Sequence, residues 1–511
     1  MDTILVIDFG GQYCHLISRR VRELHVYSQI SSNEIKAKDI KLAKETGIEI
    51  KGIIISGSHE SVYKAKPNFD KKILELGIPI LGICYGHQLL AHLMGGKVEK
   101  AEKAEFGIAE LFIDKRDEIL HGLEAKEKVW MSHSDEVKKL PENFEILAHT
   151  KNCKIAAFKH KTKKLYGVQF HPEVIHTRKG KKIFENFLFE ICKCKAEWQM
   201  EDFIDSTVKE LKDGLKGKKA IIALSGGVDS STAAALVERA IGKNLYAVFV
   251  DTGLLRKNEA EKIRSFFSSR LGENFIFIDA KERFFKALKG ITDPEEKRKV
   301  IGNLFIEIFE EVAKKIKADF LVQGTIYPDR VESGIGKAAK IKSHHNVGGL
   351  PEKLKLDLVE PLQDLYKDEV REIAKKLGLP EFIVKRHPFP GPGLAIRVIG
   401  EVTPEKVEIV RKADAIVVEE IRKAKLYDKV WQAFAVLLPI RTVGVQGDSR
   451  TYGYVIAVRI VESLDGMTAN FSKLSYEVLE KISTRITNEI PQVNRVVYDI
   501  THKPPATIEW E

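Results

Sequence analysis

One cysteine in this sequence lies in a setting that suits a nucleophile. Cys84 stands in the middle of the segment GICYG (82–86), after an apolar run at 78–83 and before a helix-like run at 87–94. The flanking glycines permit a sharp turn from strand to helix that projects the side chain, and the start of a helix favours a thiolate. The sequence therefore predicts a reactive thiol at Cys84, although a structural cysteine fits the same pattern.

A histidine and a carboxylate that could serve this thiol lie further along the chain. His171 and Glu173 belong to the segment HPE, which follows a strand-like run at 166–170. Residues two apart on an extended chain share a side, so we predict that His171 is the general base and that Glu173 orients its ring. His133 is the alternative base, but it has no carboxylate partner at the same close spacing in the sequence.

A second glycine turn predicts a phosphate site. The segment SGGVDSS joins a strand-like run at 220–224 to a helical run at 232–240, and its residues are Ser225, Gly226, Gly227, Val228, Asp229, Ser230 and Ser231. Backbone N–H groups in such a turn, hydroxyls and a helix N-terminus can bind phosphate, and Asp229 is a candidate ligand for Mg²⁺. The sequence has no GxxxxGKS/T motif, so a Walker loop is not indicated. The alternative is an ordinary turn before a helix.

The elements that must position these residues predict an α/β protein with three domains. Strand-like runs alternate with helical patterns to about residue 190 and again from Ala220 to Val322, which indicates two doubly wound, mostly parallel sheets. A proline- and glycine-rich segment at 387–393 interrupts the second pattern, and a smaller α+β dimerisation domain follows. We place the domains at 1–195, 196–387 and 388–511.

The composition argues against several classes of protein. Hydrophobic residues make up 44% and charged residues 31% of the chain, which fits a soluble globular protein, and no run is long and apolar enough for a membrane helix. Lys and Arg number 83 against 73 for Asp and Glu, so we expect anionic partners such as nucleotides, although a generally basic surface fits equally well. Five cysteines without CxxC spacing and a start unlike a secretory leader favour the cytoplasm.

Both glycine turns resemble those of known enzyme families. The motifs GxCxGxQ and HPE are similar to those of the class I glutamine amidotransferases, which implies that Cys84 attacks the side-chain amide of glutamine, His171 passes a proton to the departing ammonia and Glu173 holds the imidazole. At 56–61 the chain reads SGSHES where that family usually has a Gly-Gly-Pro turn beside the oxyanion hole. The motif SGGxDS resembles the PP-loop of the ATP pyrophosphatases, which implies attack on the α-phosphate of ATP and release of pyrophosphate.

Along its whole length the sequence resembles the glutamine-hydrolysing GMP synthetases. The resemblance runs from DFGGQY (8–13) through RHPFPGPGLAIR (386–397) to KPPATIEWE (503–511). It implies a ligase of purine biosynthesis that adenylates O2 of XMP with ATP and Mg²⁺ and lets ammonia displace AMP to give GMP. It also implies a homodimer paired through the C-terminal domain and a lid at 333–349. The residues that it indicates for XMP are Arg298, Asp448, Lys503, Ile508 and Glu509.

Two other interpretations of the sequence are open. A PP-loop enzyme that modifies tRNA would use the positive charge as an RNA-binding surface, but it has no use for the C-terminal motif. A regulatory homologue with a silent glutaminase half should lack one of Cys84, His171 or Glu173, and all three are present. We therefore expect small-molecule substrates, no nucleic acid and no membrane; release of pyrophosphate that depends on XMP distinguishes these interpretations.

Overall fold

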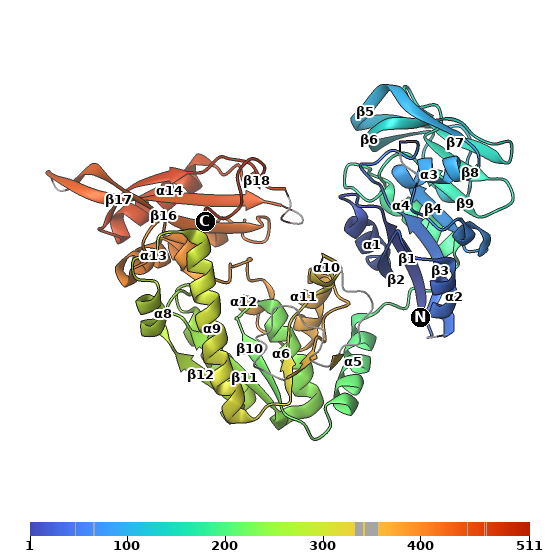
Figure 1. Cartoon of the computed structure of the whole chain (residues 1–511). Helices are drawn as coiled ribbons and strands as arrows, with labels where there is room; N and C mark the ends of the chain where they lie inside the picture. Colours follow the sequence, from blue (N-terminus) through green and yellow to red (C-terminus); the bar gives the residue numbers. More distant parts are fainter. Residues whose placement is uncertain are drawn as a thin grey trace. The chain divides into compact units, whose positions relative to one another are not determined.

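Three β-sheets organise the part of the chain that this computed structural model describes, which is residues 1–45, 47–64, 67–332, 341–342, 356–446, 448–463, 466 and 468–511 (Figure 1). Contacts divide the described residues into two units, one of residues 1–203 with Val331 and Glu332, and one of Ile204–Arg330 and the residues from Ile341 to the C-terminus. Most of the lid-like stretch at 333–349 lies outside the described residues. The predicted domain boundaries at 195 and 387 stay predictions.

The sheet of the first unit combines parallel and antiparallel halves. In the order β2-β1-β3-β4-β9-β8-β7-β5-β6, the strands from β2 to β9 are parallel and the remainder are antiparallel. All four residues of β4 are buried, as expected for a strand covered on both faces, whereas β5 has a largely exposed face. The strands are β1 (Asp2–Asp8), β2 (Tyr27–Ser32), β3 (Glu49–Ile55), β4 (Ile80–Ile83), β5 (Lys97–Ile113), β6 (Lys126–Lys139), β7 (Phe144–Thr150), β8 (Ala157–His160) and β9 (Leu165–Val168), and the helices are α1 (Cys14–Arg22), α2 (Ala37–Glu45), α3 (Tyr85–Leu93) and α4 (Gly180–Glu185).

The second unit contains a doubly wound sheet of the order β12-β11-β10-β13-β15-β14, in which only β14 is antiparallel to its neighbour. Its first strand, β10, lies inside the sheet, and the direction of winding reverses between β10 and β13. In open α/β sheets this switch point, at the carboxyl ends of the strands, is where ligands bind. The strands are β10 (Ala220–Leu224), β11 (Leu245–Asp251), β12 (Phe275–Asp279), β13 (Phe320–Val322), β14 (Ile341–Lys342) and β15 (Asp357–Val359), and the helices are α5 (Met200–Gly214), α6 (Val228–Ile241), α7 (Glu259–Leu271), α8 (Lys281–Ala287), α9 (Pro294–Ile316), α10 (Tyr327–Glu332), α11 (Lys367–Lys376) and α12 (Glu381–Val384).

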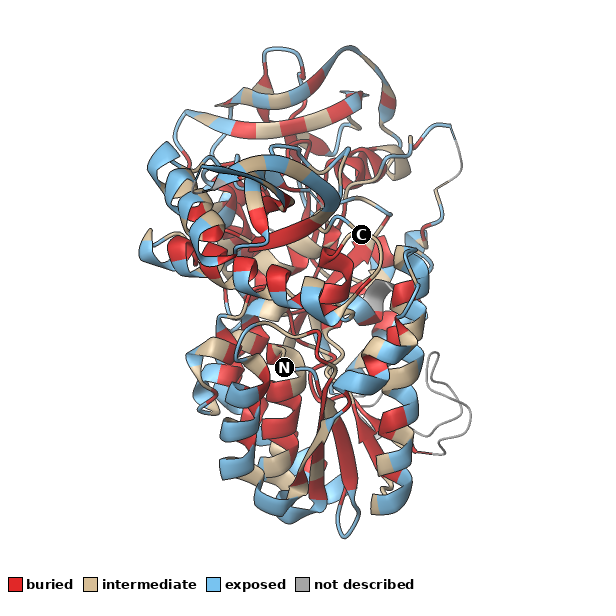
Figure 2. Ribbon diagram, turned by 90° about the vertical axis from the view of Figure 1, so that its left-hand side faces the viewer, coloured by how far each residue is buried: buried red, intermediate tan, exposed pale blue. Residues whose placement is uncertain are grey.

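A smaller sheet with two long helices completes the second unit. Its long antiparallel hairpin consists of β16 (Gln432–Gln446) and β17 (Ser449–Glu462), which also pairs with β18 (Asn470–Phe471) and, in parallel, with β19 (Val493–Tyr498); the helices are α13 (Pro404–Lys423) and α14 (Tyr476–Glu489). One apolar cluster contains residues of both sheets of this unit, from Ile221 to Val493. Figure 2 shows the buried residues on the strands and on the inner faces of the helices. The α/β class with a smaller C-terminal α+β region is thus confirmed, but the antiparallel strands β5 to β8 were not predicted.

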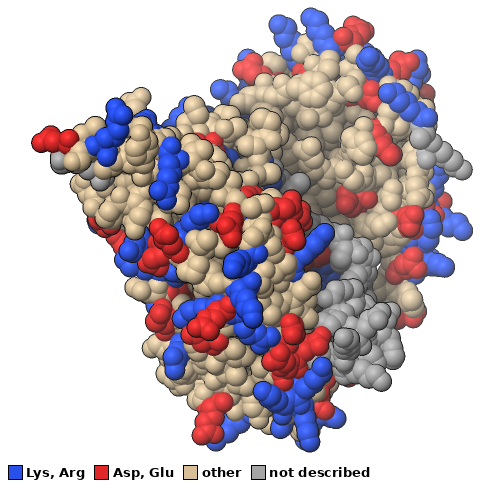
Figure 3. Space-filling model, turned by 60° about the vertical axis from the view of Figure 1, so that its left-hand side comes forward, with Lys and Arg blue, Asp and Glu red and all other residues tan. Residues whose placement is uncertain are grey.

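The surface in Figure 3 carries acidic side chains interspersed among Lys and Arg, so the net charge of +10 does not form one continuous basic area on that face. Within the described ranges, no helix combines the length and the apolar character needed to cross a bilayer. All five cysteines are buried and have free thiols.

Candidate active sites

Cys84 occupies a strained turn between β4 and α3. Its φ is +54° and its ψ is −104°, and its N–H donates to the carbonyl oxygen of Val168 on β9 at 2.8 Å. A Cβ atom at Gly82 would lie 2.4 Å from the carbonyl oxygen of Gly86, and one at Gly86 would lie 2.4 Å from that of Ile55. Only glycine fits at either position, so the structure has the strand-to-helix turn that the sequence predicts.

His171 comes to the same edge of the sheet because β4 and β9 are parallel neighbours. A Cβ atom at Gly57 would lie 3.4 Å from Cε1 of His171 and 3.7 Å from Cβ of Cys84, which places the ring beside the thiol. Nδ1 of His171 lies 2.6 Å from Oε1 of Glu173. Burial alone would lower the pKa of His171, but the negative charges of Glu173 and of the Cys84 thiolate raise that pKa well above its usual value. This arrangement favours the charged, imidazolium form of His171.

Further hydrogen bonds fix the backbone around the histidine. The hydroxyl of Thr177 donates to the carbonyl oxygen of His171 at 2.6 Å and accepts the N–H of Trp130 at 3.0 Å. Nε of Arg20 donates to the carbonyl oxygen of Glu173 at 2.9 Å. The ring therefore has a defined position before any substrate binds.

A cavity of about 730 Å³ opens at Cys84. Its wall includes residues 57–61 of the loop 56–61, where the sequence departs from the amidotransferase pattern. Oγ of Ser56 accepts a backbone N–H from the loop after β1 at 3.0 Å, and the hydroxyl of Ser61 donates to Oδ2 of Asp135 at 2.5 Å. The loop 56–61 is thus hydrogen-bonded at both ends. It forms one side of a polar cavity that is large enough for an amino acid.

His133, the alternative base, lies in the same wall, but both of its ring nitrogens have other partners. Nδ1 lies 2.9 Å from the carbonyl oxygen of Asp135, and Nε2 lies 3.3 Å from Oε2 of Glu105. His133 therefore has a carboxylate partner after all, supplied by the neighbouring strand β5. Of the two histidines, His171 is the one whose ring lies beside the thiol while a carboxylate, that of Glu173, contacts its Nδ1.

The second glycine turn joins β10 to α6, and this helix begins at Val228, earlier than the helical run in the sequence suggests. Gly226 has a φ of +72°, and Gly227 is the N-cap. The side chains of Val228 and Ser231 are buried, so these two residues can offer a ligand only backbone groups. Ser225 is exposed, and Asp229 and Ser230 are partly exposed in the first turn of the helix.

Asp229 pairs with a cation that the sequence analysis did not identify. Its Oδ2 accepts a hydrogen bond from Nζ of Lys367, the first residue of α11, and its buried Oδ1 has no partner among the described residues. A carboxylate oxygen with a vacant lone pair suits Mg²⁺, a hard cation that takes oxygen ligands. A Cβ atom at Gly324 would lie 2.9 Å from N of Ser230, so the loop after β13 also approaches the turn closely.

Two arginines connect the glycine turn to the C-terminal segment. Nη1 of Arg386 donates to the carbonyl oxygen of Ser225 at 3.5 Å. The guanidinium groups of Arg386 and Arg397 lie 5.2 and 5.1 Å from the ring centre of Phe389. Nη2 of Arg397 donates to Oε1 of Glu509 at 3.0 Å. The predicted ATP loop and part of the predicted XMP site therefore belong to one network of contacts.

Most of the residues predicted for XMP have partners within the chain. Nη2 of Arg298 donates to the main-chain oxygen of Glu511 at 2.6 Å, and Nζ of Lys503 donates to the carbonyl oxygen of Gly466 at 2.8 Å. Ile508 packs against an apolar cluster that includes residues of β16 and β17. These side chains and Glu509 belong to, or contact, the C-terminal segment.

Asp448 is placed apart from this group. It is exposed at the turn of the β16–β17 hairpin, with a φ of +60°, whereas Gln432, which donates to Glu509 at 2.6 Å, begins β16. Strand β16 has 15 residues. At about 3.3 Å per residue, Asp448 and Glu509 are separated by on the order of 40 Å along the hairpin. One chain therefore does not bring all five predicted residues together.

Comparison with known proteins gives three segments of the chain a counterpart among protein families. Residues 5–191 match the family described as glutamine amidotransferase class-I, residues 198–325 match NAD synthase, and residues 419–510 match the GMP synthase C terminal domain. Relatives named glutamine-hydrolyzing GMP synthase are similar from end to end. Those from Caldanaerobacter subterraneus subsp. tengcongensis and Caldicellulosiruptor saccharolyticus are each 56% identical, and that from Geobacillus kaustophilus is 54% identical; each comparison covers 100% of this chain and 99% of the relative.

Proposed function

This chain belongs to the glutamine-hydrolysing GMP synthases, and from that premise we propose how its residues make GMP from XMP, ATP and glutamine. The observation that carries the proposal is the position of Cys84 and His171 at the ends of neighbouring parallel strands, with Glu173 behind the ring and a polar cavity in front. The same polypeptide carries a glycine turn suited to ATP.

In the first reaction, the thiolate of Cys84 attacks the side-chain carbonyl carbon of glutamine. The developing oxyanion lies near the N-terminus of α3, where backbone N–H groups lack helical partners, and beside the backbone of Gly57. His171 donates a proton to the departing ammonia, and Glu173 stabilises the imidazolium. His171 then accepts a proton from the water that hydrolyses the thioester to glutamate.

In the second reaction, the turn from Ser225 to Ser230 binds the pyrophosphate end of ATP through backbone N–H groups and hydroxyls. Asp229 is the residue that would hold Mg²⁺, which neutralises phosphate charge when it is bound. Lys367 exchanges its pairing with Asp229 for a phosphate oxygen. O2 of XMP then attacks the α-phosphorus and releases pyrophosphate, and ammonia attacks C2 of the adenylate and releases AMP.

For XMP, we propose Arg298, Lys503, Ile508 and Glu509 as contacts of one subunit. Asp448 reaches XMP in the site of a second subunit, because the hairpin holds it on the order of 40 Å from Glu509 in its own chain. The hairpin has exposed apolar side chains that suit such a homodimer, namely Ile440, Val443, Val445 and Tyr452. We place the enzyme in the cytoplasm, with no nucleic acid or membrane partner.

Incubation of the purified chain with XMP, ATP, Mg²⁺ and either glutamine or ammonium tests the proposal. We expect GMP and pyrophosphate in equal amounts with both nitrogen donors, and a higher rate of glutamine hydrolysis when XMP and ATP are present. Failure to form GMP with either donor would rule the proposal out, and pyrophosphate release without XMP would favour another PP-loop enzyme.

A further inference from the structure

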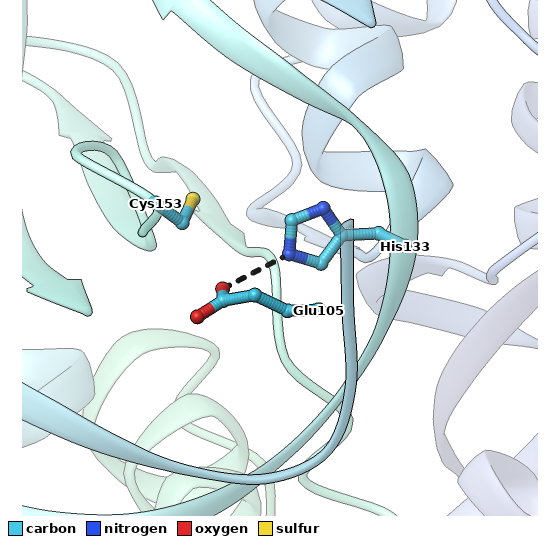
Figure 4. Close-up of side chains that lie close together, drawn as sticks. All are labelled: Glu105, His133 and Cys153. Atoms are coloured by element: carbon cyan, nitrogen blue, oxygen red, sulfur yellow. Dashed lines mark hydrogen bonds and ion pairs between the residues drawn. The ribbon is translucent and has the colours of Figure 1, made fainter. Parts of the chain in front are cut away.

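Glu105, His133 and Cys153 form a buried cluster beside the glutamine cavity (Figure 4). One potential ligand atom from each residue lies within 4.8 Å of the other two. Glu105 on β5 and His133 on β6 are register partners, and Cys153 lies in the turn that follows β7. The proposed chemistry of glutamine hydrolysis uses none of these three side chains.

The hydrogen bonds of His133 leave a lone pair directed at a carboxylate. Nδ1 lies 2.9 Å from the carbonyl oxygen of Asp135, and because that oxygen can only accept, Nδ1 carries the hydrogen. In the neutral ring Nε2 then presents a lone pair, 3.3 Å from Oε2 of Glu105. Two acceptors can face each other at this distance only if a positive charge lies between them, either a proton or a metal ion.

The separation of these two atoms suits a metal ion better than a proton. A charge-assisted hydrogen bond from nitrogen to a carboxylate spans about 2.7–2.9 Å. Tetrahedral Zn²⁺, with nitrogen and oxygen ligands at about 2.0–2.1 Å, holds those atoms about 3.3 Å apart. With Zn–S near 2.3 Å, the sulfur lies about 3.6 Å from the nitrogen, so Sγ of Cys153, which now lies within 4.8 Å of that nitrogen, needs to move by no more than about 1.2 Å.

Hydrogen bonds with neighbouring groups already orient both the carboxylate of Glu105 and the ring of His133. The hydroxyl of Thr150 donates to Oε1 and Oε2 of Glu105 at 2.9 and 3.0 Å, and Nδ2 of Asn152 donates to Oε1 at 3.3 Å. Metal-binding histidines usually donate their second ring N–H to a carbonyl or carboxylate, as His133 does. We propose that Glu105, His133 and Cys153 bind one Zn²⁺ ion, with a water molecule as the fourth ligand and the thiol proton released to solvent.

The ion would act on the segment that forms the wall of the glutamine cavity. The carbonyl oxygen of Ser132, next to His133, accepts from the thiol of Cys84 at 3.6 Å. The carbonyl oxygen of Asp135 accepts from Nε2 of Gln88 at 2.8 Å as well as facing His133. A metal bound to His133 therefore holds in place backbone groups that contact the nucleophile and its neighbouring helix.

Metal titration of the full-length Cys84→Ala protein tests this site, because that variant lacks the catalytic thiol as a competing ligand. After treatment with a chelator, we expect one Zn²⁺ per chain by calorimetry and, with Co²⁺, an absorption band from a cobalt–thiolate bond. Adding Cys153→Ala should abolish the band and weaken Zn²⁺ binding at least about tenfold. Adding Glu105→Gln, which preserves the shape of the side chain, should weaken binding to a similar extent and keep the band.

Cys194→Ala in the same background is the matched control, since it removes another buried free thiol and should change neither measurement. Absence of stoichiometric Zn²⁺ binding would overturn the proposal and leave a proton between His133 and Glu105. Equal Zn²⁺ affinity with and without Glu105→Gln, or a cobalt–thiolate band that survives Cys153→Ala, would overturn it as well. Because the readout is metal binding, its failure is distinct from a failure to make GMP.

Discussion

The two candidate sites of this chain differ in what their charged residues are paired with. At the glutamine site the reactive groups are paired with one another: the carboxylate of Glu173 faces the ring of His171, which lies beside the thiol of Cys84. At the nucleotide site the proposed ligand-binding groups are paired with protein atoms, as in the contact of Lys367 with Asp229 and that of Arg397 with Glu509. The first site is assembled before substrate binds, whereas the second must change partners.

This difference has a thermodynamic consequence. A buried, preorganised site does not reorganise when the substrate arrives, so its residues act mainly on the rate of the chemical step. A site whose cations already pair with protein oxygens, as Lys367 does with Asp229 and Lys503 with Gly466, gives up those pairs when the nucleotide binds, so part of the interaction with the nucleotide offsets their loss. We therefore expect substitutions at the first site to change kcat and substitutions in the XMP region to change KM.

The largest effect is expected for Cys84→Ala, which should separate the activity of the glutamine site from that of the nucleotide site. Cys84→Ala removes the nucleophile and should lower glutamine-driven synthesis of GMP at least about a thousandfold, whereas ammonium-driven synthesis should be retained. Rates with the two nitrogen donors, measured on the same preparation, check this result. If both rates fall equally, the two reactions are not divided as we propose.

Asp229→Asn should have the opposite effect, because it should impair the nucleotide site and leave the glutamine site active. Loss of the carboxylate removes the proposed ligand of Mg²⁺ and should lower GMP synthesis with either donor by about two to three orders of magnitude, because phosphate charge is no longer neutralised. Hydrolysis of glutamine without nucleotides should be unchanged. Asp205→Asn, which affects an exposed carboxylate on α5 of the same unit, is the control for general effects of charge. Full pyrophosphate release by Asp229→Asn would contradict the assigned role.

A smaller effect, visible in the pH profile, should follow from Glu173→Gln. The charge of Glu173 helps to raise the pKa of His171 against the effect of burial, so the amide should lower that pKa. The protonated imidazole, which donates to ammonia, is then lost at a lower pH, and the alkaline limb of kcat for glutamine hydrolysis should move to lower pH. We expect kcat at neutral pH to fall about ten- to a hundredfold. An alkaline limb at its original position would show that another group controls the proton.

The smallest effect should appear at the XMP site. Lys503→Ala removes one cation and should raise the KM for XMP about tenfold, the value of one charge-assisted hydrogen bond, while glutamine hydrolysis is unaffected. Lys473→Ala removes an exposed cation of the same domain and serves as the control. A similar rise in KM in both variants would indicate that only the general positive charge of this region matters.

The turn that carries Cys84 and the contact between His171 and Glu173 could be predicted because local rules determine their geometry; their catalytic roles stay a proposal. Two glycines specify the turn at Cys84, and an HPE segment after a strand places His171 and Glu173 on one side. The first residue of α6 could not be predicted, because the sequence did not reveal that Gly227 is the N-cap of this helix. The burial of Ser231 was therefore not expected.

Pairs that are distant in sequence were also missed. Lys367 lies 138 positions from Asp229, and Glu105 lies 28 positions from His133. The register of the β5–β6 pair, which belongs to the antiparallel half of the first sheet, is what brings Glu105 to His133. Register depends on packing and turn geometry across the whole sheet, which a single sequence does not specify locally.

Neighbouring strands in a sheet lie about 4.7–4.9 Å apart, and Cys84 and His171 leave two such neighbours, β4 and β9. Cys84 follows β4 directly and His171 follows β9 by three residues, so the sheet largely determines how far apart the two residues lie. Heat inactivation of glutamine hydrolysis should therefore coincide with cooperative melting of the first unit, with full activity retained up to the onset of that transition.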